Sequence, residues 1–263
     1  MNIAIIGYGK MGKLIERHIL ERGHRVAAIV DPGAPAESGS PSGAQICRNA
    51  GEAPGLEKAD AAIEFTRPDT AAGNIFAMIE RRIPLVVGTT GWLDRLEEIR
   101  RAVEAAGASL LWSSNFSLGV NLFYRIAAYA ARLVDPFPEY DAGGWEAHHN
   151  KKADSPSGTA KTLVEGVLAQ MSRKSAPVWE TLDRPPKAEE LHYPSLRTGS
   201  IPGTHTMIFD SPADSIELIH RARNREGFAS GAVQAAEWLT QSGSGEARQG
   251  VFTMDDVLAD LGL

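Results

Sequence analysis

The amino-terminal segment of this 263-residue chain constrains its fold more than any other part. An apolar run from Ile3 to Ile6 leads directly into Gly7-Tyr8-Gly9-Lys10-Met11-Gly12, a GxGxxG pattern. Apolar residues then recur at helical spacing, and a second apolar run ends at Asp31. Alone, the glycine pattern fits a structural turn equally well. In this context of strand, turn, helix, strand and acidic residue it predicts a dinucleotide-binding unit, with the pyrophosphate at the start of the helix.

Asp31 bears on which dinucleotide is bound. A carboxylate at the end of the second strand accepts hydrogen bonds from the adenosine ribose and repels a 2′-phosphate. Pro32 supplies no compensating cation, although Lys10 or Arg48 is available to pair with such a phosphate. We therefore expect NADH to bind at least as well as NADPH. The sequence leaves the ratio between the two open.

Strand and helix patterns alternate as far as residue 117. Apolar runs at 61–66, 85–87 and 109–112 end in small or polar residues. This alternation predicts a Rossmann-type doubly wound parallel sheet, which binds ligands at the carboxyl ends of its strands. The loops that follow two of these strands, Gly88 to Trp92 and Ser113 to Ser117, are expected to converge on one dinucleotide, although either loop alone fits a simple turn equally well.

The character of the chain changes after a helical pattern at 118–134. Strand-like stretches lie around Ile201, at 204–209 and at 215–220, which indicates a second α+β domain with a mixed or antiparallel sheet. The last segment is expected to return to the first domain. The expected divisions are a dinucleotide-binding domain (1–117), a substrate-binding and oligomerisation domain (118–228) and a C-terminal segment (229–263).

The densest group of polar residues lies between Glu146 and Lys161. Gly143-Gly144 permits a turn, and a short strand from Trp145 to His149 places Glu146 and His148 on one face. Lys151-Lys152 and a Pro-Ser-Gly-Thr turn follow. These residue types in this order call for a chemical explanation, because a core would exclude them.

Ser157 is a candidate N-cap for the helix that follows. The amide groups of Gly158 and Thr159 then lie in its first turn, where a carboxylate or phosphate is favoured. His148 or Lys152 is suited to give a proton to the bound anion. The alternative is an exposed basic loop after an edge strand. Arg221, Arg223 and Arg225 offer either a partner for a substrate carboxylate or a solvated strand end.

Composition excludes several classes of function. A net charge of −6 argues against a nucleic-acid partner, and no apolar run approaches the ~20 residues of a membrane span. One cysteine, Cys47, and the lack of a signal-like start favour the cytoplasm. No metal is expected, because neighbouring histidines on a strand point to opposite faces and no HExxH or paired-cysteine motif is present.

Together these motifs resemble the 4-hydroxy-tetrahydrodipicolinate (dihydrodipicolinate) reductases of lysine and diaminopimelate biosynthesis. The resemblance extends over nearly the whole chain. Its most specific part is the HHxxKxDxPSGTA pattern at 148–160. The other matching motifs are the GxGxxG loop, Gly88-Thr89-Thr90-Gly91, Asn115-Phe116-Ser117, Gly199 to Thr206 and Gly250-Val251-Phe252.

The resemblance implies an NADH- or NADPH-dependent reduction of a small heterocyclic dicarboxylate by a homotetramer. It implies that His148 is the proton donor or acceptor and Lys152 a second proton donor. The residues implied to line the cofactor are Gly7, Tyr8, Gly9, Lys10, Met11, Gly12, Asp31, Phe65, Thr66, Gly88, Thr89, Thr90, Ser113, Ser114, Asn115 and Phe116. The residues implied to bind the substrate carboxylates are His149, Gly158, Thr159 and Arg225. The sequence departs from the family at Lys10, where arginine is common, and at Glu64, where aspartate is usual.

The residues argue against two rival functions. A dinucleotide-dependent semialdehyde dehydrogenase needs a cysteine nucleophile, and Cys47 lies in the wrong part of the chain. A non-enzymatic dinucleotide sensor would leave the histidine and lysine cluster without a purpose.

Overall fold

The computed structural model describes residues 1–33, 39–241 and 247–262. The chain forms two compact units, one comprising Met1–Ser117 with Glu226–Leu263 and the other Leu118–Arg225. The return to the first unit therefore begins at Glu226, three residues before the expected position. The reason is that Glu226 opens the last long helix and its carboxylate pairs with Arg17 and His18 in the first unit.

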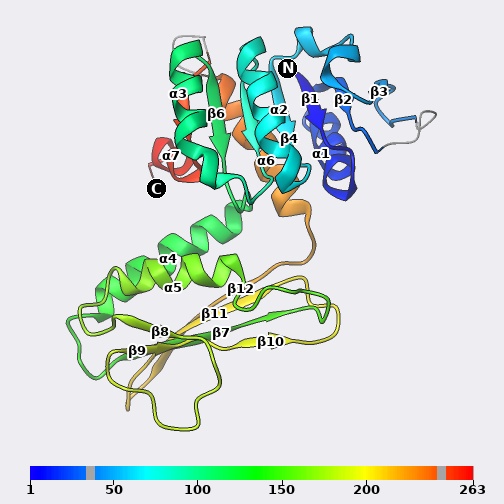
Figure 1. Ribbon diagram of the computed structural model, residues 1–263. Helices are drawn as coiled ribbons and strands as arrows, with labels where there is room; N and C mark the ends of the chain where they lie inside the picture. The colour runs from blue at the N-terminus through cyan, green and yellow to red at the C-terminus, as the bar shows by residue number, and fades with distance from the viewer. Residues whose placement is uncertain (34–38, 242–246, 263) are drawn as a thin grey trace. The chain divides into compact units, whose positions relative to one another are not determined.

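The first unit contains a seven-stranded parallel sheet in the order β13-β6-β5-β4-β1-β2-β3 (Figure 1). This order and direction confirm the predicted Rossmann-type sheet. The short strand β3 was not predicted. The strands are β1 (Asn2–Ile6), β2 (Arg25–Val30), β3 (Ile46–Cys47), β4 (Ala61–Glu64), β5 (Leu85–Val87), β6 (Ser109–Trp112) and β13 (Gly250–Phe252).

Helices cover both faces of this sheet, because successive residues of each strand point to opposite faces and both sets are apolar. In β1, Ile3 and Ile5 belong to the core under one set of helices, whereas Ala4 and Ile6 belong to the core under the other. The first set is α1 (Lys10–Glu21), α6 (Glu226–Thr240) and α7 (Met254–Asp260); the second is α2 (Pro68–Arg81) and α3 (Leu96–Ala106). Short 3₁₀ turns lie at η1 (Ala50–Glu52), η2 (Leu56–Lys58) and η3 (Leu93–Arg95).

An ion-pair group joins α6 to α1. Glu237 accepts hydrogen bonds from Arg22 (2.5 and 2.8 Å) and lies 2.7 Å from Nε2 of His24. Burial alone would raise the pKa of Glu237, but the bonds from Arg22 and His24 outweigh it and lower the pKa. The carboxylate therefore stabilises the fold in its ionised form.

We expect Glu237→Gln to lower the free energy of unfolding by about 1–2 kcal/mol near neutral pH. Because the folded-state pKa is lowered, this contribution is present above the ordinary glutamate pKa and is lost as the pH falls through the folded value. Urea unfolding at about pH 7 and about pH 4 measures it. Glu98→Gln on α3, which breaks an exposed pair with Arg95, is the control and should change little. If Glu237→Gln lowered the free energy of unfolding by the same amount at both pH values, the expectation would be contradicted.

The second unit is a mixed four-stranded sheet, ordered β10-β7-β11-β12, with two helices on one face (Figure 1). This confirms the predicted α+β domain. Its core lies between that face and helices α4 (Leu118–Val134) and α5 (Gly158–Leu168) and includes Phe123, Leu163 and Met207. The strands are β7 (Asp141–His148), β10 (Ser195–Arg197), β11 (Thr204–Asp210) and β12 (Ser215–Arg221), and a separate pair is formed by β8 (Ala176–Val178) and β9 (Glu190–His192).

Two local expectations in this unit are wrong. Gly143-Gly144 is not a turn but part of β7, because Gly144 is covered by the chain: a β-carbon there would lie 2.2 Å from the carbonyl oxygen of Thr206 and 2.6 Å from the ring of Tyr193. Ile201 lies in a loop, and the strand begins only at Thr204. Within the described ranges, no helix is long and apolar enough to cross a membrane.

Candidate functional site

The residues expected to bind a dinucleotide gather at one edge of the parallel sheet. β6, β5, β4, β1 and β2 are consecutive neighbours in that sheet, so their carboxyl ends meet. The strand order reverses between β1 and β4, which is where such sheets bind ligands. The segments at this edge are the glycine loop Gly7–Gly12 after β1, Asp31 after β2, Phe65-Thr66 after β4, Gly88-Thr89-Thr90 after β5 and Ser113–Phe116 after β6.

The three glycines of the loop differ in what they leave room for. Gly7 has a φ of 95°, and a β-carbon on it would lie 2.2 Å from the carbonyl oxygen of Phe65. A β-carbon on Gly12 would lie 2.2 Å from the carbonyl oxygen of Gly7. At Gly9, the N-cap of α1, a β-carbon would meet nothing within 4 Å. Gly7 and Gly12 are thus required by the chain itself, whereas Gly9 leaves open space at a helix start, which fits a pyrophosphate.

The carboxylate of Asp31 holds the glycine loop against the end of β2. Its Oδ2 accepts the amide of Tyr8 at 2.6 Å, and its Oδ1 accepts the amide of Gly33 at 2.7 Å. Each carboxylate oxygen can accept a further hydrogen bond. Asp31 therefore keeps the loop in position and can accept further hydrogen bonds, and its contact with a ribose stays a prediction.

Aromatic packing joins the ends of β4, β5 and β6. The rings of Phe65 and Phe116 have centroids 6.0 Å apart. A β-carbon on Gly88 would lie 2.1 Å from the ring of Phe65, so only glycine fits there. The hydroxyl of Thr89 accepts the amide of Thr66 at 2.7 Å. These contacts give the edge of the sheet a fixed shape.

The loop after β6 is closed by its own polar groups. The hydroxyl of Ser113 donates to the carbonyl oxygen of Asn115 at 2.9 Å, and the side chain of Asn115 accepts the amide of Ser117 at 2.9 Å. The shape of this loop is therefore set by hydrogen bonds between its own residues.

Glu64, the departure from the family pattern, is fully buried at the end of β4. The hydroxyl of Thr66 and the amide of Asn74 donate to its Oε1, while Oε2 is buried with no hydrogen-bond partner. Burial raises the pKa of Glu64. The side chain thus anchors Thr66 and α2 from beneath the sheet edge.

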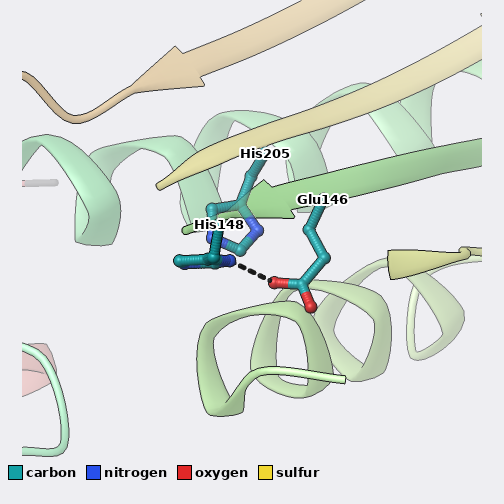
Figure 2. A group of neighbouring side chains, drawn as sticks. All are labelled: Glu146, His148 and His205. Carbon is teal, nitrogen blue, oxygen red and sulfur yellow. Dashed lines mark ion pairs between the residues drawn. The ribbon is translucent and has the colours of Figure 1, made fainter. Parts of the chain in front are cut away.

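In the second unit, strand register gathers polar side chains on the face that the helices cover. Glu146 and His148 lie two residues apart on β7 and share that face. Glu146 is directly opposite His205 of β11 on one side and Ser195 of β10 on the other, and His148 is opposite Arg197 of β10. Figure 2 shows how Glu146, His148 and His205 converge.

Glu146 is fully buried and contacts five polar groups. Its Oε1 accepts the amide of Ser157 (3.0 Å), the hydroxyl of Ser195 (2.7 Å) and Nη2 of Arg197 (2.8 Å). Its Oε2 accepts the hydroxyl of Ser157 and lies 3.0 Å from Nδ1 of His148. Burial alone would raise the pKa of Glu146, but contacts with His148, Ser157, Ser195 and Arg197 outweigh it and hold the pKa well below its usual range.

The helix α5 begins as predicted. Ser157 is its N-cap and accepts the amide of Ala160 at 3.1 Å. The first-turn amides of Gly158 and Thr159 belong to the end of the helix that attracts anions. The hydroxyl of Tyr124 on α4 is hydrogen-bonded to the side chain of Thr159. Burial raises the pKa of Tyr124 to about 12, so this hydroxyl stays protonated.

The other predicted residues lie around this group. Nζ of Lys152 is 2.8 Å from Oδ1 of Asp154 and its side chain is largely covered. His149, which follows β7, is half-buried, and its Nδ1 is buried. Arg225 is exposed at the last residue of the unit, so its role stays a prediction.

Three of these side chains are a potential metal-binding set. Ligand atoms of Glu146, His148 and His205 lie within 4.8 Å of one another. The third member of this set, His205, comes from another strand, β11, and not from the pair of adjacent histidines. Burial lowers the pKa of His205 to about 4, so it is neutral. Arg197 already neutralises the carboxylate, which opposes a divalent cation, and the expectation of no metal stays a prediction.

Sequence reasoning missed Arg197, Ser195 and the part played by His205. The arginines considered from the sequence, Arg221, Arg223 and Arg225, were candidates for a substrate carboxylate, whereas Arg197 pairs with Glu146. Its strand, β10, has only three residues, too few for an alternating pattern to be recognised. His205 lies within Gly199 to Thr206, one of the motifs on which the resemblance rests, but the sequence alone assigned no role to this histidine.

Comparisons with known proteins agree with these observations. The family "Dihydrodipicolinate reductase, N-terminus" matches residues 1–116, and "Dihydrodipicolinate reductase, C-terminus" matches 119–258. Proteins named 4-hydroxy-tetrahydrodipicolinate reductase are 38% identical in Christiangramia forsetii, over 99% of both chains, and 35% identical in Chromobacterium violaceum, over 98% of both. One in Archaeoglobus fulgidus is 34% identical over 98% of this chain and 100% of its own.

A solved structure has the same fold. The dipicolinate-bound dihydrodipicolinate reductase from Paenisporosarcina sp. TG-14 superposes with a TM-score of 0.74 over 96% of this chain and 97% of that one, at 22% identity. The two family matches and the similarity of the fold thus indicate the same family. The chain belongs to the dihydrodipicolinate reductase family of NAD(P)H-dependent oxidoreductases.

Proposed function

We propose that this protein reduces (2S,4S)-4-hydroxy-2,3,4,5-tetrahydrodipicolinate to (S)-2,3,4,5-tetrahydrodipicolinate, with loss of water, in lysine and diaminopimelate biosynthesis. The observation that carries the proposal is the HHxxKxDxPSGTA segment, whose first histidine is buried against Glu146 beside the start of α5. An imidazole, an ammonium group and a helix start within one short segment suit a small anionic substrate that must receive a proton.

The chain's own residues divide the chemistry between them. The first-turn amides of Gly158 and Thr159, with His149 and Arg225, bind the two carboxylates. When bound, NADH or NADPH supplies a hydride to C4 of the substrate ring. Protonation of the reduced substrate falls to side chains of the second unit, His148 and Lys152, both of which are largely buried.

The name of the Paenisporosarcina relative supports the class of substrate, because it was solved with dipicolinate, a planar heterocycle with two carboxylates. The rival semialdehyde dehydrogenase finds no support in the position of Cys47. That thiol is buried on β3 and donates to the carbonyl oxygen of Glu52 at 3.3 Å. It is a packed side chain of the first unit and is not placed as a nucleophile.

The test is oxidation of NADH and of NADPH, followed by absorbance, with substrate generated enzymatically in the same vessel. We expect turnover that requires both the dinucleotide and the dicarboxylate. Dinucleotide binding without turnover would favour a sensor instead. The ratio of kcat/KM for the two dinucleotides gives the preference that the sequence leaves open.

Replacing Asp31 should change that preference. We expect Asp31→Ser to weaken NADH and to improve NADPH relative to it by about 10-fold, because the carboxylate that binds the ribose and repels a 2′-phosphate is removed. Asp60→Ser is the matched control, since Asp60 also accepts a backbone amide (Asn2, 2.6 Å) but precedes β4 instead of following a strand. An unchanged NADH-to-NADPH ratio in Asp31→Ser would show that this carboxylate does not face the ribose.

We also propose that the protein works as a homotetramer in the cytoplasm, assembled through the second unit. The register of β7, β10, β11 and β12 puts Trp145, Leu196 and Ile219 on the sheet face opposite the helices, where Leu196 is 52% and Ile219 40% exposed. Exposed apolar side chains on one face favour association. Size-exclusion chromatography with light scattering should give a molar mass of four chains for the wild type. Ile219→Glu should lower that mass, and a monomeric wild type would refute the assembly.

A further inference from the structure

The side chain of Glu146 is aimed at one ring nitrogen of His148. Nδ1 of His148 lies 3.0 Å from Oε2 of Glu146 and is buried, at ion-pair distance although not aligned as a good hydrogen bond. On a neutral imidazole, the proton is most stable on the ring nitrogen that faces a carboxylate. The other ring nitrogen, Nε2, is then the one left to exchange a proton.

The opposite side of the ring is kept open by a glycine. A β-carbon on Gly203 would lie 3.0 Å from Nε2 of His148, so any other residue would cover that nitrogen. The ring of His205 stands edge-on to His148 with centroids 5.3 Å apart. The imidazole is therefore bounded by a carboxylate at Nδ1, a neutral ring at its side and a residue without a side chain, Gly203, beside Nε2.

The carboxylate itself is held from two other elements. The amide of Ser157 at the start of α5, and Ser195 and Arg197 on β10, all donate to Oε1. Because these three donors fix one oxygen, the other oxygen has a fixed direction, toward Nδ1 of His148 and the hydroxyl of Ser157. Glu146 thus joins the imidazole to the start of the proposed carboxylate-binding helix.

We propose that Glu146 is a positioning residue, which holds His148 in the tautomer with the proton on Nδ1 and thereby presents Nε2 to the substrate. The proposal rests on the proposed function for the part concerning catalysis. The placement of the proton is a property of the protein alone. Nε2 takes up a proton from solvent, which gives an imidazolium, and then transfers that proton to the reduced substrate. The Nε2–H bond breaks, a bond between the proton and the substrate forms, and the ring returns to the neutral tautomer with its proton on Nδ1.

Glu146→Gln separates this role from simple packing. The amide oxygen must take the place of Oε1, because Ser157, Ser195 and Arg197 all need an acceptor there. The NH₂ group then faces Nδ1 of His148 and donates to it, which moves the imidazole proton to Nε2. We expect kcat to fall about 100-fold or more with KM changed by less than about 3-fold.

The matched control is Glu190→Gln on β9. Glu190 is also buried and paired with an arginine, Arg184, at 2.7 and 2.8 Å, but it does not contact His148. We expect its turnover to match the wild type. Glu146→Asp is the second variant, because a shorter carboxylate still cannot donate a hydrogen bond; it should keep the proton on Nδ1 and recover part of the turnover even if Glu146→Gln folds poorly.

Nitrogen NMR of histidine-labelled protein, without substrate and at about pH 8, reports the tautomer directly, with His148→Ala used to assign the signal. The wild type should show the proton on Nδ1 and Glu146→Gln should show it on Nε2.

Identical His148 nitrogen shifts in wild type and Glu146→Gln would overturn the proposal, as would an equal loss of turnover in Glu190→Gln. If the wild type fails to reduce the proposed substrate, the proposed function fails, but the tautomer measurement still decides whether Glu146 orients His148.

Discussion

Lys152→Ala and His148→Ala should each lower turnover by about 100-fold or more while NADH affinity stays nearly unchanged. Both side chains belong to the second unit, whereas the glycine loop and the strand ends proposed to hold the dinucleotide belong to the first. Removing a proton donor therefore affects the chemical step without touching the binding site for the reductant. NADH fluorescence titration and steady-state turnover, measured on the same preparations, give the two quantities.

Lys151→Ala is a control supplied by the chain itself. Lys151 is adjacent to Lys152 and carries the same charge, but it is exposed. The side chain of Lys152 is only 23% exposed, and its Nζ lies 2.8 Å from Oδ1 of Asp154. A general effect of basic charge on a dianionic substrate would lower turnover in both lysine variants. A specific proton donor predicts a large loss in Lys152→Ala only. Turnover like that of the wild type in both Lys152→Ala and His148→Ala would remove these residues from catalysis.

The first unit could be predicted in some detail because its information is local. Each buried strand is followed within a few residues by a polar or glycine-rich turn, and parallel strands carry those turns to the same edge whatever the order of the sheet. The expected helix from Leu118 to Val134 and the N-cap at Ser157 are confirmed for the same reason, since cap and periodicity are read over a single element.

The second unit was harder because its site is made by strand register. Glu146 meets Ser195 and His205 only after β10 and β11 pair with β7, and no pattern within any one of these segments specifies that pairing. The expected turn at Gly143-Gly144 was wrong for a related reason. Two adjacent glycines favour a turn in isolation, but here Tyr193, almost 50 residues away in sequence, packs where a side chain at 144 would stand.

Gly9→Ala should weaken NADH binding by about 10- to 100-fold without destabilising the protein. The backbone at Gly9 has a φ of −75°, which alanine adopts, and a β-carbon there would meet no atom of the chain within 4 Å. Any cost of the extra methyl group must then arise from the ligand. The space it would occupy lies at the start of α1, where we expect the pyrophosphate to approach the amide groups.

Two other glycine variants make the result interpretable. Gly12→Ala should lower the melting temperature, because its β-carbon would lie 2.2 Å from the carbonyl oxygen of Gly7 whether or not NADH is present. Gly73→Ala, inside α2 with open space around it, should leave NADH affinity unchanged and stabilise the fold by up to about 1 kcal/mol. If Gly9→Ala binds NADH as tightly as the wild type, the pyrophosphate does not lie on this loop, because a methyl group could not be accommodated between the helix start and a phosphate in contact with it.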